Sequence, residues 1–147
     1  MVPAATDDGN LPPGVHWCSW EEIEVRFGTT RHRRWLLDGL RRALIELKAA
    51  GCATAYIDGS FVSEKKVPGD FDGCWDPRGV ALSKLDPVLQ DFSNHRARQK
   101  AKYGGELFPS TITESGSGQA FLDFLQTDKS TGAPKGILAL DLLREFS

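Results

Sequence analysis

The sequence predicts an α/β (α+β) protein in which a small mixed β-sheet is backed by helices. Between residues 30 and 49, apolar side chains recur at helical spacing along an otherwise charged segment. Residues 53–58 and 71–75 instead form short apolar runs bounded by glycine or turn residues, which is typical of strands. Helical and strand-like segments keep alternating toward the end of the chain, and this order favours one mixed sheet.

Length and composition indicate one domain of ordinary globular type. The 147 residues are 40 % hydrophobic, and a formal net charge of -2 excludes a chain-wide electrostatic attraction for nucleic acid. Residues 1–13 are rich in Pro, Gly, Asp and Asn, so we expect a flexible N-terminal arm followed by a single domain over residues 14–147. No apolar run reaches membrane-spanning length and no signal-peptide pattern is present, so we expect a cytoplasmic protein without a membrane partner.

Two helices are expected near the start of the domain. Ser19 can act as an N-cap, and Glu22 three residues later completes a capping box, so a short helix should run to about Gly28. The second helix, over residues 30–49, would bury its apolar stripe. Its opposite, charged face includes Arg33 and should be exposed.

Turn and breaker residues indicate the remaining elements. Asp86 and the proline after it open a third helix, which should continue, with a break near Ser93, to about residue 104. Residues 106–113 are expected to form an edge strand, because Pro109 lacks an amide hydrogen. Residues 120–126 are predicted to be a further strand, and residues 137–146 fit either a helix or a strand.

The residues that carry chemistry lie between positions 56 and 75. The first strand ends in Gly59-Ser60, where backbone amides and a hydroxyl can hold a phosphate. Asp70 and Asp72 flank one residue, so their carboxylates point to the same face of the second strand. Two carboxylates this close repel each other, and Mg²⁺ (or Mn²⁺) removes that conflict when it binds them together with phosphate oxygens. The segment therefore predicts a site for a divalent metal and a triphosphate.

The same segment resembles a known signature. Gly59-Ser60, a nine-residue spacer and Asp70-Phe71-Asp72 resemble the motif of the nucleotidyltransferase superfamily that includes DNA polymerase beta. The run GSFVSEKKVPGDFD is also similar to a family of small uncharacterised bacterial nucleotidyltransferase-like proteins. In that family, segments like those at residues 11–14 and 131–137 flank the core. The resemblance implies a minimal nucleotidyltransferase fold.

The resemblance also implies roles for individual residues. Gly59 and Ser60 would contact the nucleoside triphosphate, and Asp70 and Asp72 would hold Mg²⁺. The superfamily usually supplies a third carboxylate from a later strand, as metal ligand and as base for the acceptor. Asp123, within the predicted strand at residues 120–126, matches this role best, and the alternatives are Asp128, Glu106 or no residue at all.

Several basic residues are candidates for binding phosphate. Lys129 and Lys135 lie in a polar loop after Asp123 and could reach triphosphate oxygens, with ordinary solvated loop lysines as the alternative. The basic stretches at residues 31–34 and 95–102 could bind an RNA backbone, but solvated helix faces explain them more simply.

These expectations combine into a Mg²⁺-dependent enzyme that transfers a nucleoside monophosphate from ATP or another NTP to a hydroxyl group. RNA, a protein and a small molecule are the acceptors left open. Proteins of the superfamily often act in toxin–antitoxin or phage-defence pairs, and at this chain length a partner protein or a homodimer would complete the site. The main alternative is a catalytically inactive nucleotidyltransferase-like module that binds nucleotide or a partner. A metal-dependent phosphohydrolase is the third interpretation.

Overall fold

A five-stranded mixed sheet forms the centre of the domain, with the strand order β1-β5-β2-β3-β4. The computed structural model describes residues 1–146, apart from the side chain of Ser60. The strands are β1 (Gly14–Trp17), β2 (Thr54–Asp58), β3 (Phe71–Trp75), β4 (Gly105–Pro109) and β5 (Gly136–Asp141). The helices are α1 (Trp20–Phe27), α2 (Arg31–Ala49), α3 (Ser93–Tyr103), α4 (Phe121–Phe124) and α5 (Leu142–Glu145). Parallel pairs (β1–β5, β3–β4) and antiparallel pairs (β5–β2, β2–β3) occur together, which confirms the predicted α+β class.

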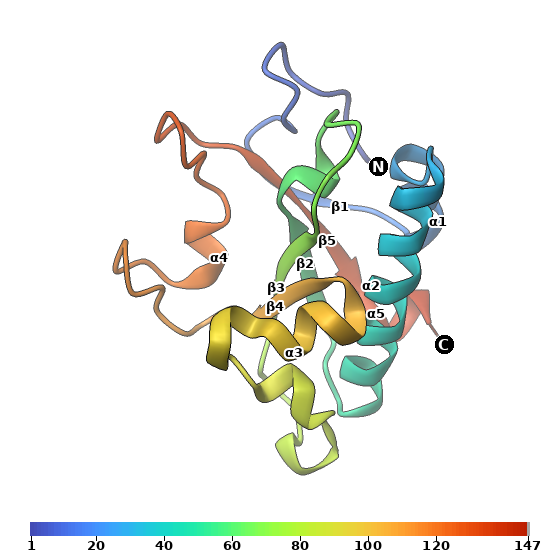
Figure 1. The fold of residues 1–147 in the computed structure, drawn as a ribbon, viewed down its shortest axis with the longest axis vertical. Helices are drawn as coiled ribbons and strands as arrows, with labels where there is room; N and C mark the ends of the chain where they lie inside the picture. Colours follow the sequence, from blue (N-terminus) through green and yellow to red (C-terminus); the bar gives the residue numbers. More distant parts are fainter. Residues whose placement is uncertain (147) are drawn as a thin grey trace.

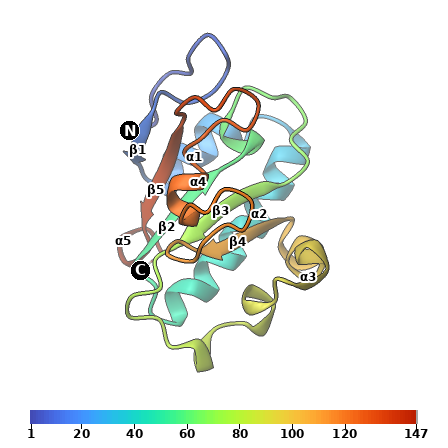
Figure 2. The ribbon, with the colours of Figure 1, turned by 90° about the vertical axis from the view of Figure 1, so that its left-hand side faces the viewer.

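The two faces of the sheet have different neighbours. Helices α1 and α2 lie along one face, whereas α4 and the loops around it lie over the other (Figure 1, Figure 2). Because side chains alternate along a strand, Ile57 and Phe71 point toward the helices, and both are fully buried in the core. Asp58 and Asp72 alternate with them and therefore lie on the face toward α4.

Local sequence signals locate the first two helices. Ser19 and Glu22 form the predicted capping box at α1, which ends at Gly28. The hydroxyl of Thr30 caps α2 by accepting a hydrogen bond from the Arg33 amide at 3.1 Å. Among residues 1–146, no helix combines the length and the apolarity that crossing a bilayer would require.

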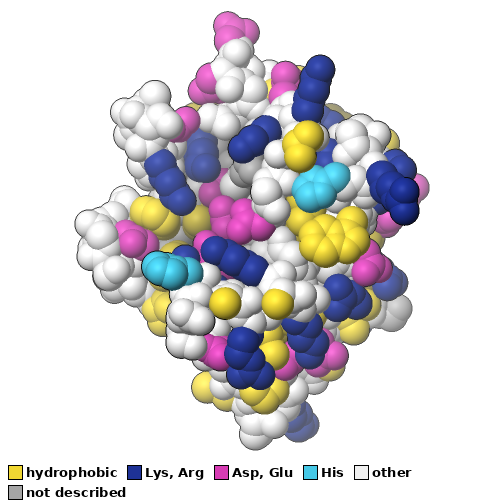
Figure 3. All heavy atoms as spheres, in the orientation of Figure 1, with side chains coloured by type: hydrophobic (Ala, Val, Ile, Leu, Met, Phe, Trp, Pro, Cys, Tyr) yellow, Lys and Arg dark blue, Asp and Glu magenta, His cyan; other side chains and the backbone are white. Residues whose placement is uncertain are grey.

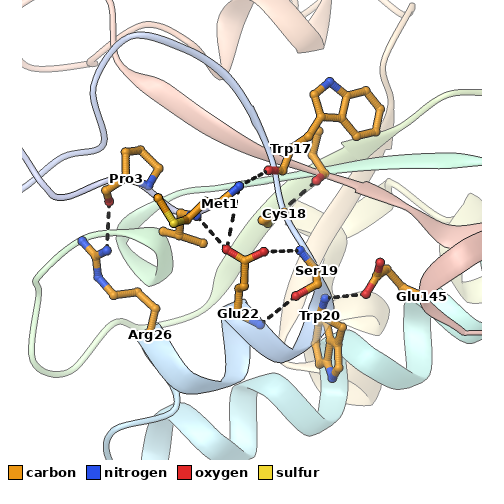
Figure 4. A network of polar contacts seen from close by, with 11 residues as sticks. Met1, Pro3, Trp17, Cys18, Ser19, Trp20, Glu22, Arg26 and Glu145 are labelled. Carbon is orange, nitrogen blue, oxygen red and sulfur yellow. Dashed lines mark hydrogen bonds and ion pairs between the residues drawn. The ribbon is translucent and has the colours of Figure 1, made fainter.

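Glu22 also holds the first residues of the chain against α1 (Figure 4). Its carboxylate accepts a hydrogen bond from the Val2 amide at 3.0 Å. Arg26, one turn further along the helix, donates to the Pro3 carbonyl at 2.9 Å. In this structure Val2 and Pro3 are therefore held against α1, and the flexibility of residues 1–13 stays a prediction.

The segment predicted as a strand at residues 120–126 contains helix α4, so that prediction was wrong. Phe121 and Phe124 are three residues apart, and a helical turn brings side chains with this spacing to the same side. Phe121 stacks on Phe108 of β4 with ring centroids 4.0 Å apart, and Phe124 meets Phe121 edge-on. These contacts suit a helical turn, whereas an alternating strand would point the two rings in opposite directions.

The other late elements follow the sequence more closely. Residues 137–146, which fitted either structure, divide between strand β5 and helix α5. The strand predicted at residues 106–113 ends at Pro109, and β4 is an edge strand, where proline is tolerated. The break expected near Ser93 is present at residues 94–96, where the backbone is left-handed.

Arg33 is buried rather than exposed, which corrects the prediction for the charged face of α2. Its guanidinium donates hydrogen bonds to the carbonyls of Phe61 at 2.7 Å, Ser63 at 3.0 Å and Lys65. It also lies over the ring of Phe27, 5.9 Å from the ring centroid. Three carbonyl groups of the loop between β2 and β3 thus share one donor side chain, which holds this loop against α2.

Replacing Arg33 by methionine should destabilise the domain, because the apolar stem is kept while the donors to three carbonyl groups are lost. We expect the free energy of unfolding, measured by urea denaturation, to fall by about 2 to 4 kcal/mol. Arg34→Met, on the exposed side of the same turn, is the matched control and should change it by less than about 0.5 kcal/mol. Equal stability of the two variants would show that the loop does not depend on this guanidinium.

Candidate functional site

Three acidic residues lie side by side on neighbouring strands. The register pairs Asp58 of β2 with Asp72 of β3, and Asp72 with Glu106 of β4. Residues paired in this way point to the same face of a sheet. Asp70 immediately precedes β3 and is two residues from Asp72 along the chain, so its side chain points to the same face of the sheet. We call these four residues the carboxylate cluster.

The turn after β2 packs directly against this cluster. Gly59 has a left-handed φ of +86°, and a Cβ atom at this position would lie 2.8 Å from Oδ2 of Asp72. Only glycine therefore fits both the backbone conformation and the space. The first turn of the 3₁₀ helix Ser60–Val62 follows at once, and the Ser60 hydroxyl, which was predicted to contact the triphosphate, lies outside the described residues.

A second glycine explains how β3 fits between its neighbours. This glycine is Gly73, in the middle of β3. A Cβ atom here would lie 2.3 Å from the Tyr56 carbonyl oxygen and 2.9 Å from a methyl group of Leu107. The lack of a side chain at Gly73 therefore permits the close strand packing that sets Asp72 beside Asp58.

Burial and mutual repulsion disfavour the charged form of these carboxylates. Burial raises the pKa of Asp72 to about 7, and the negative charges of Asp70 and Glu106 add to this effect. Burial also raises the pKa of Asp70, again with a contribution from Glu106. Burial raises the pKa of Asp58, although the charge of Lys135 opposes the shift.

Cations neutralise only part of the cluster. Lys135 pairs with Asp58 at 3.2 Å, and Arg96 pairs with Glu106 at 2.8 Å. Among the described residues, no lysine or arginine forms a salt bridge with Asp70 or Asp72. The space-filling view shows acidic side chains gathered in a hollow that is bordered by lysine and arginine (Figure 3). The middle of the cluster is therefore left with unpaired negative charge.

Two adjoining pockets open beside Asp72. The first, about 270 Å³, is lined by Asp58, Gly59, Asp72, Lys129 and Lys135, among others. The second, about 390 Å³, is lined by Asp72, Glu106 and several aromatic side chains. Both pockets are lined by Asp72, Phe124, Leu125 and Lys129, and these side chains separate a mainly polar compartment from an aromatic one. We call these compartments the polar pocket and the aromatic pocket.

The structure brings together most of the residues predicted from the sequence. Gly59, Asp72, Lys129 and Lys135 line the polar pocket, and Asp70 lies close enough for its charge to act on Asp72. Lys129 is exposed, with its Nζ 5.6 Å from the centroid of the Phe124 ring, whereas the Lys135 side chain is only 17 % exposed. Both lysines thus lie within the site. Lys135 forms a salt bridge with Asp58, whereas Lys129 lies over an aromatic ring.

Asp123 lies elsewhere. It is exposed in α4 and lines neither pocket, because the segment that should have carried it as a strand is a helix. Glu106, which the sequence offered only as an alternative, holds the position beside Asp72 instead. The sequence already predicts a strand starting near Glu106, and this prediction could have favoured Glu106 over Asp123. The sequence does not reveal that this strand pairs in parallel with β3, because the two segments are distant along the chain. Asp58 is the last residue of β2, and only the strand pairing in the structure shows that it belongs to the cluster.

The residues present fit a divalent metal in part. The described residues contain no group of three or more His, Cys, Asp or Glu side chains already arranged to hold a metal ion. Asp70 and Asp72 nevertheless offer oxygen donors on one face, without a salt bridge of their own, and their pKa values are raised by burial first and by the neighbouring carboxylates second. Mg²⁺ sites commonly use one or two carboxylates and complete the shell with water and phosphate oxygens.

The raised pKa of Asp72 predicts how stability depends on pH in metal-free buffer. The folded state holds this proton more tightly than the unfolded state, so the carboxyl costs stability as pH rises from about 4 to about 7. We expect Asp72→Asn to be more stable than the wild type by at least about 1 kcal/mol at pH 8, and the difference to vanish near pH 4. Urea denaturation at both pH values, in the presence of a chelator, measures this difference.

Asp123→Asn is the matched control for that comparison, because its carboxyl is exposed. It should change the free energy of unfolding by less than about 0.5 kcal/mol at either pH. If Asp72→Asn instead lowers stability at pH 8, the Asp72 carboxylate stabilises the fold and is not held there against repulsion.

Comparisons with known proteins agree with a domain that spans nearly the whole chain. No curated protein and no solved structure matches the sequence. One family model matches residues 3–141 and is described as a family of unknown function (DUF6932). The match includes the carboxylate cluster, the Gly59 turn and both loop lysines. The chain therefore belongs to the family of unknown function DUF6932.

Proposed function

We propose that the protein is a Mg²⁺-dependent nucleotidyltransferase that transfers a nucleoside monophosphate from an NTP to a hydroxyl acceptor. The observation that carries this proposal is the contact between the Gly59 turn and Asp72. It unites a turn suited to phosphate with two carboxylates that have no salt bridge. A phosphohydrolase needs similar carboxylates but has no need of such a turn, so the transferase is favoured.

Asp70 and Asp72 are the residues that would hold Mg²⁺ or Mn²⁺. When bound, the metal neutralises their charge and draws electron density from the phosphate oxygens. Backbone amides of the turn that follows Gly59 and the ammonium group of Lys129 would bind the β- and γ-phosphates in the polar pocket. Lys135 remains paired with Asp58 and keeps the charge of that buried carboxylate compensated.

In the proposed reaction, the acceptor oxygen attacks the α-phosphorus, and the bond from this phosphorus to the β-bridging oxygen breaks. Pyrophosphate leaves, and the acceptor hydroxyl loses its proton. Glu106 would take that proton, because its carboxylate lies beside Asp72 at the wall of the aromatic pocket. Positioning and electrostatic stabilisation would supply most of the rate, as in phosphoryl transfer generally.

The acceptor is RNA, a protein or a small molecule, and the proposal extends to a cytoplasmic role in which a partner protein or a homodimer completes the site. The toxin–antitoxin or phage-defence setting is part of the same proposal and rests on the resemblance of the motif. The small size of the domain supports a partner, because one compact sheet with two pockets leaves little room for a separate acceptor-binding unit.

One observation favours the alternative of a binding module without turnover. Glu106 is paired with Arg96 at 2.8 Å and lies 3.6 Å from Lys100, so the carboxylate best placed to act as a base is neutralised. The enzyme therefore requires Arg96 to leave Glu106 when substrates bind, whereas the module does not.

Titration calorimetry with ATP, GTP, CTP and UTP tests the proposal. We expect binding of at least one NTP that requires Mg²⁺ and that weakens at least tenfold in Asp70→Asn/Asp72→Asn, while Asp123→Asn binds like the wild type. Binding that ignores both Mg²⁺ and the double substitution, or no binding of any NTP, would contradict the proposal.

Glu106→Gln separates the enzyme from the binding module. With an NTP labelled at the α-phosphorus and a total RNA and protein extract as acceptor, the wild type should transfer label. The variant should still bind Mg²⁺ and NTP but transfer about 10² to 10⁴ times more slowly. Nucleotide binding without transfer in the wild type would favour the module.

A further inference from the structure

The aromatic pocket adjoins the polar pocket but differs from it in chemistry. It has a volume of about 390 Å³, and four phenylalanine rings line it: Phe92, Phe108, Phe121 and Phe124. The wall that it shares with the polar pocket consists of Asp72, Phe124, Leu125 and Lys129. A molecule with phosphates at the Gly59 turn would therefore extend past Asp72 into a compartment lined by rings.

The rings in this pocket are arranged for stacking. Phe92 and Phe108 are stacked with centroids 5.6 Å apart and planes 16° apart, and Phe108 and Phe121 are stacked at 4.0 Å and 7°. Phe124 stands nearly perpendicular to Phe121, at 84°. The stacking of Phe121 on Phe108 attaches α4 to the sheet, so packing of the domain explains why these two rings are present. Phe92 packs on Phe108 but lies outside the main hydrophobic core and is 36 % exposed, so one edge of this group of rings is open to a ligand.

A strained backbone supports the pocket from the side of α3. Asn94, His95 and Arg96 have consecutive φ values of 55°, 55° and 58°, a conformation that residues with a Cβ atom rarely adopt in succession. The left-handed turn places the guanidinium of Arg96 beside Glu106, and over the Phe108 ring at 5.5 Å from its centroid. Strain of this kind persists where function requires a particular placement. Here it adds a planar cation to the ring-lined wall.

We propose that the aromatic pocket binds a nucleobase. Bases stack on aromatic side chains and on arginine with little dependence on sequence, and both kinds of surface line this pocket. The inference rests on the proposed function, because the neighbouring polar pocket is where phosphates of the same molecule would lie. The base belongs either to the donor NTP or to the acceptor next to its attacking hydroxyl, and binding experiments separate these two sources.

The test compares three ligands on four proteins by titration calorimetry. The ligands are Mg²⁺-tripolyphosphate, the Mg²⁺-NTPs, and nucleosides added in the presence and in the absence of Mg²⁺-tripolyphosphate. The proteins are the wild type, Phe121→Leu, Phe92→Leu and Trp35→Leu. Phe92 lies at the exposed rim, so its replacement keeps the test valid if Phe121→Leu fails to fold. Trp35, an aromatic side chain that is 60 % exposed and lines neither pocket, is the matched control.

We expect the loss of a ring in the pocket to weaken binding of the base-containing ligand by about fivefold to a hundredfold, with tripolyphosphate unaffected. Trp35→Leu should bind all ligands like the wild type. If the effect is seen with NTPs, the base comes from the donor. If NTPs bind no better than tripolyphosphate and the effect is seen with nucleosides, it comes from the acceptor.

The remaining outcomes distinguish this inference from the proposed function. Nucleotides and nucleosides that bind equally well to the wild type and to both ring variants would overturn the nucleobase pocket, and Mg²⁺-tripolyphosphate binding would leave the transferase proposal standing. Nucleoside binding that depends on the rings, together with a failure of tripolyphosphate and NTPs to bind, would support the pocket and overturn the transferase.

Discussion

The site depends on one constraint, which is repulsion between carboxylates. The register of the sheet holds these carboxylates side by side. β2, β3 and β4 bring Asp58, Asp72 and Glu106 into one row, although these residues are far apart in the sequence. Lysine and arginine compensate the two ends of the row, at Asp58 and at Glu106. The middle keeps its unpaired charge, and burial makes that charge costly. A fold that retains this cost at one point, while compensating it on both sides, agrees with our proposal that a cation binds there.

The surrounding backbone is shaped to permit this row. Gly73 lets β3 approach its neighbours, and Gly59 lets the turn pass close to the Asp72 carboxylate. Arg33 then holds the following loop by three carbonyl groups, so that the chain returns to Asp70 in a defined path. These three residues shape the backbone around the site, and their role does not require contact with a substrate.

Local signals in the sequence were sufficient for much of the fold. A capping box located α1, and the helical spacing of apolar side chains located α2. Glycine-bounded apolar runs located β2, which Gly59 follows, and β3, which carries Asp72. Long-range pairing was not accessible in this way. Glu106 joins the cluster only because β4 pairs in parallel with β3, and Asp123 leaves it because Phe121 and Phe124 favour a helical turn. The burial of Arg33 likewise depends on a loop some 30 residues away, which no helical periodicity can reveal.

The most direct measurement is a crystal structure of the protein with Mn²⁺ and a non-hydrolysable NTP, in which anomalous scattering locates the metal. We expect Mn²⁺ bound by Asp70 and Asp72 together with phosphate oxygens that lie against the Gly59 turn. Metal and phosphates bound elsewhere, with Asp70 and Asp72 paired to lysine or arginine, would contradict the assignment of this cluster as the metal and nucleotide site.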